Sequence, residues 1–387
     1  MLTRDFDYDL PPHLIARHPA PNREDSRLMR VARGAASFEH RSFRDLPRLL
    51  RPGDLLVLND TRVFPARLLG TRLPDHGKIE ALLLNPIGPD AWWALVRPGK
   101  KIKRGDRLVF APGRLEARVE AYGPQGRGER LLRFEWQGEW WETLEAVGHT
   151  PLPPYILKAR KQLENQPRPE EPEDRQRYQT VFAGPQRQSV AAPTAGLHFS
   201  PAVLEDLDRL GIERAFLTLS IGAGTFQPIK TERVEEHSMH EEHFSVPRAA
   251  AAQINRARSE GRRIVAVGTT VVRALETAAL LGAETKPERI AGVPFRPDAA
   301  PSDSPQNVSF APGEVVPAVS GWTKLLLAPG FSFRITDALL TNFHLPRSSL
   351  LLLVSALAGR ETILAAYREA VANNYRFYSY GDCMLIE

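Results

Sequence analysis

Short apolar runs separated by turns dominate the stretch from residue 66 to residue 148. The runs are rich in branched and aromatic residues, and they read KIEALLL, AWWALVR, DRLVFA, LEARVEAY and RLLRFEW. Turns that contain Pro or Gly separate them at intervals of about eight to twelve residues, a spacing typical of a small antiparallel barrel or sandwich. We therefore predict an all-β barrel domain at 66–148, inserted into a larger domain.

The rest of the chain has a different pattern, in which predicted strands alternate with predicted helices. After Gly211, AFLTLSIG and RRIVAVG predict strands, whereas AAAAQINRARSEG and TTVVRALETAALLG predict helices. Further on, TKLLLA predicts a strand, and Ser348 or Ser349 caps another helix. This alternation argues for a mainly parallel sheet or a barrel. We predict an α/β fold in which residues 1–65 and 149–387 form the large domain.

Polar residues gather at five junctions between predicted elements. The motifs are NDTR at 59–62, APTAGLHF at 192–199, GAGTF at 222–226, EEHSMHEEH at 235–243 and TNFHLP at 341–346. Open α/β sheets and α/β barrels place ligands at the carboxyl ends of their strands. The junctions therefore converge if the large domain is such a sheet or barrel. Their histidines, carboxylates, hydroxyls and arginine suit acid–base and positioning chemistry.

Each junction also has a simpler interpretation. Asp60 and Arg62 either bind a ligand or form a local ion pair, and the segment around His198 is either a ligand-binding loop or a tight turn with a satisfied histidine. GAGTF lacks the third glycine of a dinucleotide fingerprint, so it is a turn beside an adenosine or a sugar, or a simple tight turn.

The histidines of the EEHSMHEEH motif also leave alternatives open. On a helix, His237 and His240 would share a face and could hold a metal. A polar pocket lining or a histidine–carboxylate pair for proton transfer fits this segment better.

Composition restricts the class of protein further. The chain has 387 residues, of which 42% are hydrophobic and 25% charged, as expected for a globular protein of two domains or of one domain with an insertion. Its one cysteine, Cys383, excludes disulfides and a cysteine zinc site, and we expect it to be a buried small residue. The N-terminus lacks a signal pattern and the apolar run at 350–359 is too short to span a bilayer, so we expect a cytoplasmic protein without membrane contact.

The charge balance does not decide whether the chain binds a polyanion such as a nucleic acid. A formal net charge of +5 and a pI near 9.4 permit a polyanionic partner. In the β domain, a basic run at 100–104 follows the tryptophan pair at 92–93, which suits either a nucleic-acid face or exposed turns. The segments 165–177 and 284–320 predict loops. An RNA-binding module without catalysis and a histidine-ligated metallohydrolase are both compatible with these features.

A set of sequence blocks along nearly the whole chain carries a further signal. The blocks are DYDLPPHLIA, LVLNDTRVFPARL, RYQTVFA, VAAPTAGLHFS, GAGTF, EEHSMHEEHF, AVGTTVVRALE, TNFHLPRSSLLLLVSA and YRFYSYGDCMLI. Together they resemble the S-adenosylmethionine:tRNA ribosyltransferase-isomerases of queuosine biosynthesis. The resemblance implies a modified α/β barrel with an inserted β-barrel domain. It also implies transfer of the ribosyl part of S-adenosylmethionine to the aminomethyl-deazaguanine wobble base of tRNA, with rearrangement to an epoxycyclopentane and loss of adenine and methionine.

The resemblance implies partners as well, and the chain departs from the family in three places. S-adenosylmethionine is expected as a substrate and not as a regenerated cofactor, tRNA with a GUN anticodon is expected to bind through its anticodon loop, and no metal is expected. Ser220 stands where the family usually has histidine, and His243 stands where an aromatic residue is more usual. The excursion at 284–320 is longer than typical. The first departure puts a histidine's role at that position in doubt, and the others concern the periphery.

The implied reaction assigns roles to residues of these motifs. The sulfonium makes the adjacent ribose carbon acidic, so a base is needed beside it, and a neutral imidazole suits this task at physiological pH. We predict His198 as the base, with His344 or His240 as the alternative. Asp60 is expected to orient the ribose or the incoming amine, and Asp382 to complement the sulfonium or aminomethyl cation. Substrate binding is assigned to Arg62, Asn59, Thr61, Thr194, Gly196, Gly222, Gly224, Thr225, Glu242, Thr269, Arg273, Asn342 and Tyr380.

Overall fold

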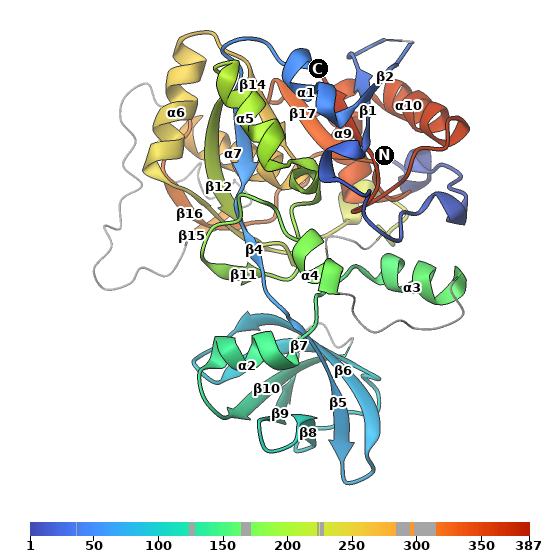
Figure 1. The fold of residues 1–387 in the computed structure, drawn as a ribbon, viewed down its shortest axis with the longest axis vertical. Helices are drawn as coiled ribbons and strands as arrows, with labels where there is room; N and C mark the ends of the chain where they lie inside the picture. Colours follow the sequence, from blue (N-terminus) through green and yellow to red (C-terminus); the bar gives the residue numbers. More distant parts are fainter. Residues whose placement is uncertain are drawn as a thin grey trace.

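The computed structural model describes residues 1–35, 37–123, 128–163, 172–222, 224, 228–283, 295–297 and 315–387. Thr225 and most of the predicted loops at 165–177 and 284–320 lie outside the described residues; in the described parts, residues 172–177 form a helix and residues 295–297 and 319–320 belong to strands, so the loop prediction is wrong there. The chain forms a large α/β domain with a smaller barrel below it, and the two join through a narrow neck near β4 (Arg62–Val63) and α4 (Pro172–Arg177) (Figure 1). The predicted fold class, α/β with an inserted all-β barrel, is confirmed.

The small domain is a closed barrel of antiparallel strands in the order β10–β7–β6–β5–β8–β9. Its elements are β5 (Arg67–Leu73), β6 (Gly77–Pro86), β7 (Ala91–Arg97), β8 (Arg107–Ala111), β9 (Leu115–Tyr122), β10 (Glu129–Trp136) and the helix α2 (Trp140–Val147). Alternate residues along a strand face inward, and Leu132 and Phe134 of β10 fill the interior in this way. The ring of Trp140 packs 5.8 Å from that of Trp92 and holds α2 on the barrel. Residues 66 and 148 as domain limits stay a prediction.

The large domain is built on a mixed 10-stranded sheet with the order β15–β16–β13–β12–β3–β14–β17–β18–β1–β2. Its strands are β1 (Arg27–Val31), β2 (Glu39–Ser42), β3 (Leu55–Asn59), β12 (Glu213–Leu219), β13 (Glu242–Val246), β14 (Ile264–Val267), β15 (Phe295–Pro297), β16 (Val319–Thr323), β17 (Ala338–Asn342) and β18 (Cys383–Ile386). A separate short pair is formed by β4 (Arg62–Val63) and β11 (Arg187–Ser189). Strands β3, β14 and β17 are buried at every residue, so they read as continuous apolar runs and not as alternating ones.

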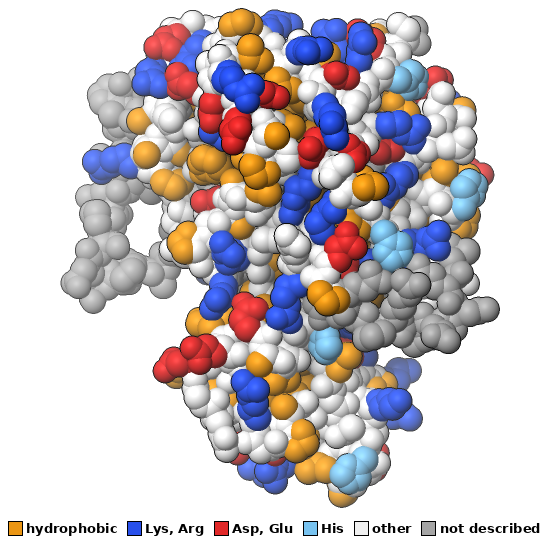
Figure 2. Space-filling view, viewed as in Figure 1, with side chains coloured by type: hydrophobic (Ala, Val, Ile, Leu, Met, Phe, Trp, Pro, Cys, Tyr) orange, Lys and Arg blue, Asp and Glu red, His pale blue; other side chains and the backbone are white. Residues whose placement is uncertain are grey.

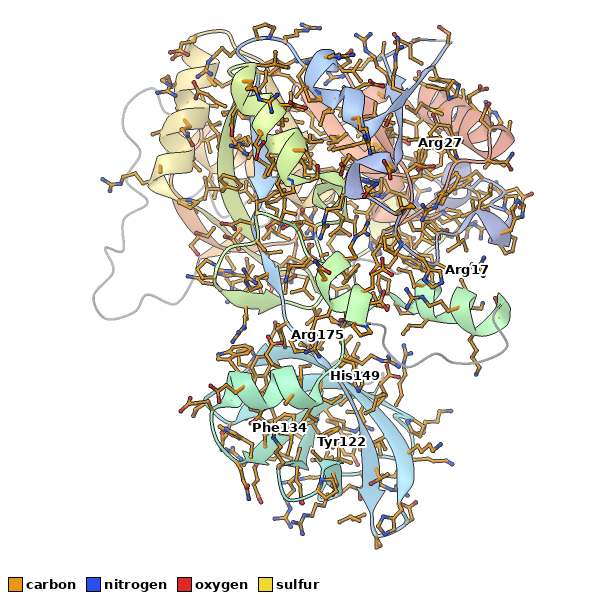
Figure 3. All side chains as sticks on the ribbon, viewed as in Figure 1. Arg17, Arg27, Tyr122, Phe134, His149 and Arg175 are labelled. Carbon is orange, nitrogen blue, oxygen red and sulfur yellow. The ribbon has the colours of Figure 1, made fainter. Side chains whose placement is uncertain are left out.

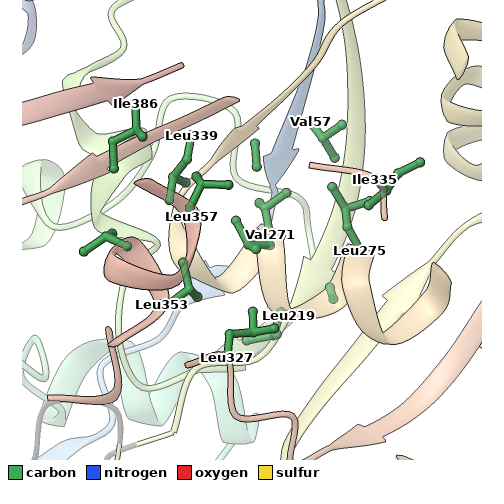
Figure 4. Close-up of a cluster of buried hydrophobic side chains, with 14 of the residues drawn as sticks. Val57, Leu219, Val271, Leu275, Leu327, Ile335, Leu339, Leu353, Leu357 and Ile386 are labelled. Atoms are coloured by element: carbon green, nitrogen blue, oxygen red, sulfur yellow. The ribbon is translucent and has the colours of Figure 1, made fainter. Parts of the chain in front are cut away.

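Helices cover the sheet and complete its core. They are α1 (Leu46–Leu49), α3 (Pro154–Leu163), α4 (Pro172–Arg177), α5 (Pro201–Arg209), α6 (Arg248–Ser259), α7 (Thr269–Ala283), α9 (Ser349–Ala358) and α10 (Arg360–Ala372). Figure 4 shows Val271 and Leu275 of α7 among Val57 of β3, Leu339 of β17 and Leu353 of α9. Each such buried side chain contributes about 1.5–3 kcal/mol to folding. Among the described residues no single helix is long and apolar enough to cross a membrane, and α9 with α10 passes that test only as a pair bent by 114°.

The structure corrects one predicted strand. TKLLLA was predicted as a strand over 323–328, but β16 ends at Thr323 and residues 324–328 have no regular structure. Thr323 Oγ1 accepts a hydrogen bond from the Leu325 amide at 3.1 Å, and the Leu325 carbonyl accepts one from Arg273 Nε at 3.2 Å. The buried guanidinium of Arg273 thus takes a carbonyl that a strand would have used in its ladder.

Candidate active site

The predicted junctions meet at one edge of the large sheet. Strands β12, β3, β14 and β17 are parallel neighbours, so their carboxyl ends lie together. Strands β13 and β18 run antiparallel to this set and begin at the same edge, and so does β1, which is parallel to β18. The edge therefore brings together Asn59, Asp60, Gly222, Glu242, Thr269, Asn342 and Asp382 from motifs far apart in the sequence.

His198 lies in a buried hydrogen-bond network at this edge. It ends the short helix η5 (Thr194–His198), just before Ser200, whose Oγ accepts from the Val203 amide and caps α5 as predicted. Ser26 Oγ lies 2.7 Å from His198 Nδ1, and Asn342 Nδ2 lies 3.0 Å from His198 Nε2. The ring of His198 is tilted against that of Phe43 at 5.3 Å. Both ring nitrogens are therefore engaged, and the ring is held from two sides.

The hydrogen bonds define which tautomer His198 adopts. Asn342 Nδ2 also donates to the Tyr378 carbonyl at 3.1 Å, so the amide nitrogen, and not the amide oxygen, faces Nε2. Nε2 of His198 is then the acceptor and Nδ1 carries the proton, which it donates to Ser26 Oγ. Burial, with the nearby charges of Arg376 and Arg23, lowers the pKa of His198 to about 3. The imidazole is neutral at physiological pH.

Asp382, just before β18, is held by hydrogen bonds from Arg27 and Arg376. Its Oδ1 accepts from the Arg27 amide at 2.9 Å, and its Oδ2 accepts from Arg27 Nε at 3.2 Å and from the Arg376 amide at 2.8 Å. The carboxylate is buried, whereas the side chain of Arg27 is 40% exposed. In this arrangement Asp382 ties the start of β1 to the start of β18. Its role toward a cationic substrate stays a prediction.

Asn59 and Asp60 connect β3 to β12. Asn59 Oδ1 accepts from the Thr61 and Leu219 amides at 3.1 and 3.0 Å, and Asn59 Nδ2 donates to the Leu219 carbonyl at 3.0 Å. Asp60 Oδ1 accepts from Thr218 Oγ1 at 2.6 Å. Burial raises the pKa of Asp60, and the bond from Thr218 partly offsets this. The carboxylate of Asp60 is thus partly buried at this edge of the sheet, and its proton affinity is raised.

Arg62 does not form the local ion pair with Asp60 that its position suggested as an alternative. Its Nε donates to the Gly184 carbonyl at 2.5 Å and its Nη2 to the Ala183 carbonyl at 3.0 Å. These bonds hold the segment after Thr180 against the end of β3. The charge of Arg62 is therefore not neutralised by a carboxylate among the described residues.

Glu242 and Arg273 form a buried ion pair next to Gly222, the first residue of the GAGTF motif. Arg273 Nη1 donates to Glu242 Oε2, and both side chains are almost fully buried. Glu242 Oε1 accepts from the Gly222 amide at 3.2 Å, so the pair holds Gly222 in place. A Cβ atom on Gly224 would lie 2.2 Å from His240 Cδ2. A larger residue at 224 would therefore require the exposed ring of His240 to move.

Two predicted substrate-binding residues carry buried polar atoms without a partner among the described residues. They are Thr61, through Oγ1, and Asn342, through Oδ1. Thr180 Oγ1, which the sequence analysis did not select, is in the same situation. Folded proteins pair nearly all buried polar atoms, so such atoms mark places where a ligand or a water completes the structure.

The structure also gives the positions of three other predicted binding residues, Thr194, Thr269 and Gly196. Thr194 begins η5 and is partly exposed, and Thr269 begins α7 and is buried. A Cβ atom on Gly196 would lie 2.8 Å from Thr180 Cγ2 and from the ring of Phe182, so only glycine allows these segments to approach. The glycine supports the shape of the loop that carries His198.

Tyr380 already uses its hydroxyl in the structure. It donates to Asp174 Oδ1 at 3.1 Å, and Asp174 pairs with Arg160 through bonds of 2.6 and 2.8 Å. Asp174 and Arg160 are both buried. This group joins α3 and α4 to the turn before β18, and binding of substrate by Tyr380 stays a prediction.

The alternative histidines lie apart from the His198 network. His344 Nε2 is 2.9 Å from Thr341 Oγ1, its amide donates to the Tyr367 hydroxyl at 2.8 Å, and burial lowers its pKa to about 3. His237 follows the short helix η7 (Val234–Glu236) in extended conformation, so His237 and His240 do not share a helix face. No group of three metal-ligating side chains occurs among the described residues.

The sequence analysis missed the part of the site that the N-terminal segment supplies. None of residues 23–27 was selected as a candidate, yet Ser26 bonds to His198 and Arg27 to Asp382. Arg23 Nη1 donates to the carbonyl of Leu197 at 3.0 Å. The available signal was the density of polar side chains directly before β1, which begins at the same sheet edge. Cys383 is buried, as predicted, and burial raises the pKa of its thiol.

A cavity of about 310 Å³ opens at the neck between the two domains. Its lining includes Arg62, Glu145, Arg175, Gln179 and Arg187. Figure 3 shows Arg175 and His149 at this neck, between the large domain and the barrel. The volume lies at the lower end of the range for small-ligand pockets, about 300–1,000 Å³. Arg62 thus links the sheet edge to a cavity beside the barrel.

His198 and His344 make the protein sensitive to acid. Burial is the main cause that lowers both pKa values to about 3, against about 6.5 in an unfolded chain. Because the folded state excludes the proton, each histidine contributes stability that is complete above pH 6.5 and is lost as the pH falls from 6.5 toward 3. The slope is about 1.4 kcal/mol per pH unit for each group, so going from pH 7 to pH 5 is expected to remove about 4 kcal/mol of unfolding free energy.

Urea denaturation at pH 7 and pH 5 measures this loss. His344→Gln is expected to reduce the pH dependence by roughly half, because one of the two titrating groups is removed. His13→Gln is the matched control, since His13 is exposed and its replacement is expected to leave the dependence unchanged. Equal unfolding free energies of the unmodified protein at the two pH values would contradict the assignment of these histidines as buried and neutral.

Known proteins resemble the chain along its whole length. The model of the queuosine biosynthesis protein family matches residues 3–386. The S-adenosylmethionine:tRNA ribosyltransferase-isomerase of Moorella thermoacetica is 48% identical over 387 residues, and that of Desulfitobacterium hafniense is 45% identical over 386 residues, with 100% of both chains covered in each case. A crystal structure of S-adenosylmethionine tRNA ribosyltransferase from Thermotoga maritima is 33% identical, with a TM-score of 0.50, and the match covers 99% of this chain and 100% of that one.

Proposed function

The chain belongs to the queuosine biosynthesis protein family and is a tRNA-modifying ribosyltransferase-isomerase, and we propose that it transfers and isomerises the ribosyl group of S-adenosylmethionine onto the 7-aminomethyl-7-deazaguanine wobble base of tRNA. The product is epoxyqueuosine-tRNA. The aminomethyl nitrogen bonds to one ribosyl carbon and gives up a proton, and the carbon beside the sulfonium gives up another. The bonds from the ribose to adenine and to sulfur break, and the ribosyl atoms close into the epoxycyclopentane. Adenine leaves with one of the two protons, the other proton is released, and methionine leaves as the neutral thioether.

The observation that carries this proposal is the buried, neutral imidazole of His198 at the edge where the strand ends converge. Removing a proton from the carbon beside a sulfonium requires a lone pair, and a protonated histidine has none to offer. The low pKa of His198 keeps Nε2 unprotonated at physiological pH. We assign Nε2 as the base, with the Nδ1 proton held by Ser26 Oγ at 2.7 Å.

Substrate must displace one contact for this base to act, because Asn342 Nδ2 lies 3.0 Å from His198 Nε2 and donates to it. Asn342 Oδ1 and Thr61 Oγ1 are buried and have no partner among the described residues. Hydroxyl groups of the ribose are suitable donors to these oxygens. Asp60, at the end of β3, is positioned by Thr218 to receive the amine or to orient the ribose.

S-adenosylmethionine is consumed in this reaction and is not regenerated, so no cofactor is needed. The second substrate is tRNA with a GUN anticodon, and the place of action is the cytoplasm, where tRNA is found. Adenine and methionine are expected in equal amounts. This equality distinguishes the proposed reaction from a methyl transfer, which would release neither of them.

Adenine release from S-adenosylmethionine is the measurement that tests the proposal. We expect release only with tRNA that carries the aminomethyl-deazaguanine base, and we expect prior treatment with a chelator to leave it unchanged. Unmodified tRNA of the same sequence is the control. Binding of tRNA without adenine release would support an RNA-binding module instead, and loss of activity after chelation would support a metallohydrolase.

A further inference from the structure

Arginines from three segments surround the turn next to His198. Arg23, in the short helix η3 (Arg23–Asp25), donates to the carbonyls of Leu197 and Gln176, both at 3.0 Å. Arg177, at the end of α4, donates to the carbonyls of Pro21 and Ala20 at 3.0 and 2.6 Å. Behind them, Arg376 donates to the carbonyls of Tyr380, at 2.8 Å, and His18. Each guanidinium is thus held in place by backbone carbonyls.

These guanidinium charges are only partly neutralised: the charge of Asp382 acts to raise the pKa of Arg376, and that of Glu24 to raise the pKa of Arg23, but neither carboxylate forms an ion pair with them. Among the described residues no carboxylate forms an ion pair with the guanidinium of Arg23 or Arg376, and Arg177 has an exposed one, Glu173, at 3.5 Å. Burial, followed by the charge of Arg177, lowers the pKa of Arg23 to about 10. Fixed, partly buried like charges cost free energy unless an anion joins them.

A small hollow lies between these arginines and the histidine. Its lining includes Arg23, Arg177, Ser26, His198, Tyr380 and Gly381. Its volume of about 20 Å³ accepts a single water-sized group, which matches one oxygen of an anion whose remainder lies outside. Figure 2 shows Lys and Arg side chains across the middle of this face, from the large domain to the neck above the barrel.

We propose that Arg23 and Arg177 form an oxyanion-binding site beside His198, and that it takes one anionic group of the substrates, either a phosphate of the RNA backbone or the carboxylate of S-adenosylmethionine. The choice between these two sources rests on the proposed function. The site itself rests on the two guanidiniums, the hollow between them and the absence of a paired carboxylate on Arg23 among the described residues. Guanidinium groups bind both kinds of oxyanion through charge-assisted hydrogen bonds.

Occupation of this site changes the basicity of His198. The groups that contact its ring are Ser26, Asn342 and Phe43, which are uncharged. The charges that act on it are Arg376 and Arg23, which add to the effect of burial in lowering its pKa. An anion on Arg23 offsets part of this effect, so His198 becomes a stronger base when substrate is in place.

Sulfate is a suitable probe, because its charge does not change between pH 4 and pH 7. We would record nitrogen NMR spectra of the histidine rings in the full-length protein while adding sulfate at constant ionic strength, with the His198 signals assigned from the spectrum of His198→Gln. Saturable shifts of the His198 signals are expected at pH 7, because an anion on Arg23 changes the electrostatic field at the His198 ring. Arg177→Gln is expected to weaken sulfate binding by about tenfold, Arg177→Lys to retain part of it, and the exposed control Arg209→Gln to leave it unchanged.

The outcomes separate this proposal from the reaction itself, because the readout needs neither substrate nor turnover. Absence of a sulfate effect on His198, or an equal effect in folded Arg177→Gln, would overturn the site. If the site holds, direct binding identifies the source of the anion. Weaker tRNA binding by Arg177→Gln, with a salt slope reduced by about one, indicates a phosphate, whereas weaker S-adenosylmethionine binding alone indicates the carboxylate. No change in either affinity would mean an adventitious ion only and would overturn the assignment to substrate.

Discussion

Replacing His198 by glutamine is expected to lower the rate of adenine release at saturating substrates by about 10²- to 10⁴-fold, the usual contribution of a general base. Glutamine fills a similar volume and can still bond to Ser26 and Asn342, but its side chain has no basic nitrogen. The fold is therefore expected to survive, and the loss to appear in kcat and not in the dissociation constants of the two substrates. Single-turnover measurement of adenine release, beside direct binding of each substrate, checks this.

A matched variant separates a base from a residue that only shapes the site. Ser26→Ala keeps the imidazole and removes the partner of Nδ1, which lies 2.7 Å away in the structure. We expect it to lower turnover by roughly tenfold, since one hydrogen bond is lost and the tautomer is less firmly held. If His198→Gln turned over at nearly the normal rate, the base would have to be His344, His240 or Asp60 instead.

The parts of the fold that local patterns control were predictable from sequence. In the barrel, inward and outward residues alternate along each strand and turns recur at short intervals, so the strands from β6 to β10 were each visible as separate runs. The start of α5 was equally visible, because Ser200 and Pro201 together define a helix N-terminus. In each of these cases the determining residues lie within one turn or one strand of one another.

The arrangement of the candidate site depends on contacts that no local pattern contains. Ser26 meets His198 across 172 positions of sequence, and Arg27 meets Asp382 across 355. The second contact follows from the parallel pairing of β1 with β18, and the first from the packing of η3 against η5; a single sequence reveals neither. The same limit explains the strand wrongly predicted at 323–328. Its apolar residues suit a strand, but the buried Arg273 takes the carbonyl of Leu325.

The sequence also did not predict that Glu242 pairs with Arg273, although both residues were selected as candidates. They lie 31 positions apart on β13 and α7, and the structure shows that their side chains bond to each other inside the protein. Arg273 bonds in addition to the carbonyls of Leu325 and Thr323, at 3.2 and 3.4 Å. The structure therefore supports a role in which the pair holds the Gly222 amide, and contact of either residue with substrate stays a prediction.

Breaking this pair is expected to have the largest effect on stability of any single replacement at the site. Arg273→Met leaves the carboxylate of Glu242 buried without its cation, and Glu242→Gln leaves the guanidinium without its anion. Removing one partner of a buried ion pair costs about 3–5 kcal/mol, because the remaining charge stays desolvated. Urea denaturation at pH 7 measures this cost, and the exposed control Glu213→Gln, which breaks a surface pair with Arg256, is expected to cost less than about 1 kcal/mol.

The double replacement decides whether the cost comes from the unpaired charge. With Glu242→Gln and Arg273→Met together, no buried charge remains, so the double variant is expected to be more stable than either single variant by about 1–3 kcal/mol. Additive losses in the double variant would show that water reaches the pair and that its charges are not desolvated. Binding of S-adenosylmethionine by the double variant separates an effect on function from an effect on stability. Even where the double variant folds, the Gly222 amide loses the charged acceptor that now lies 3.2 Å away, so weaker binding of S-adenosylmethionine is expected to persist.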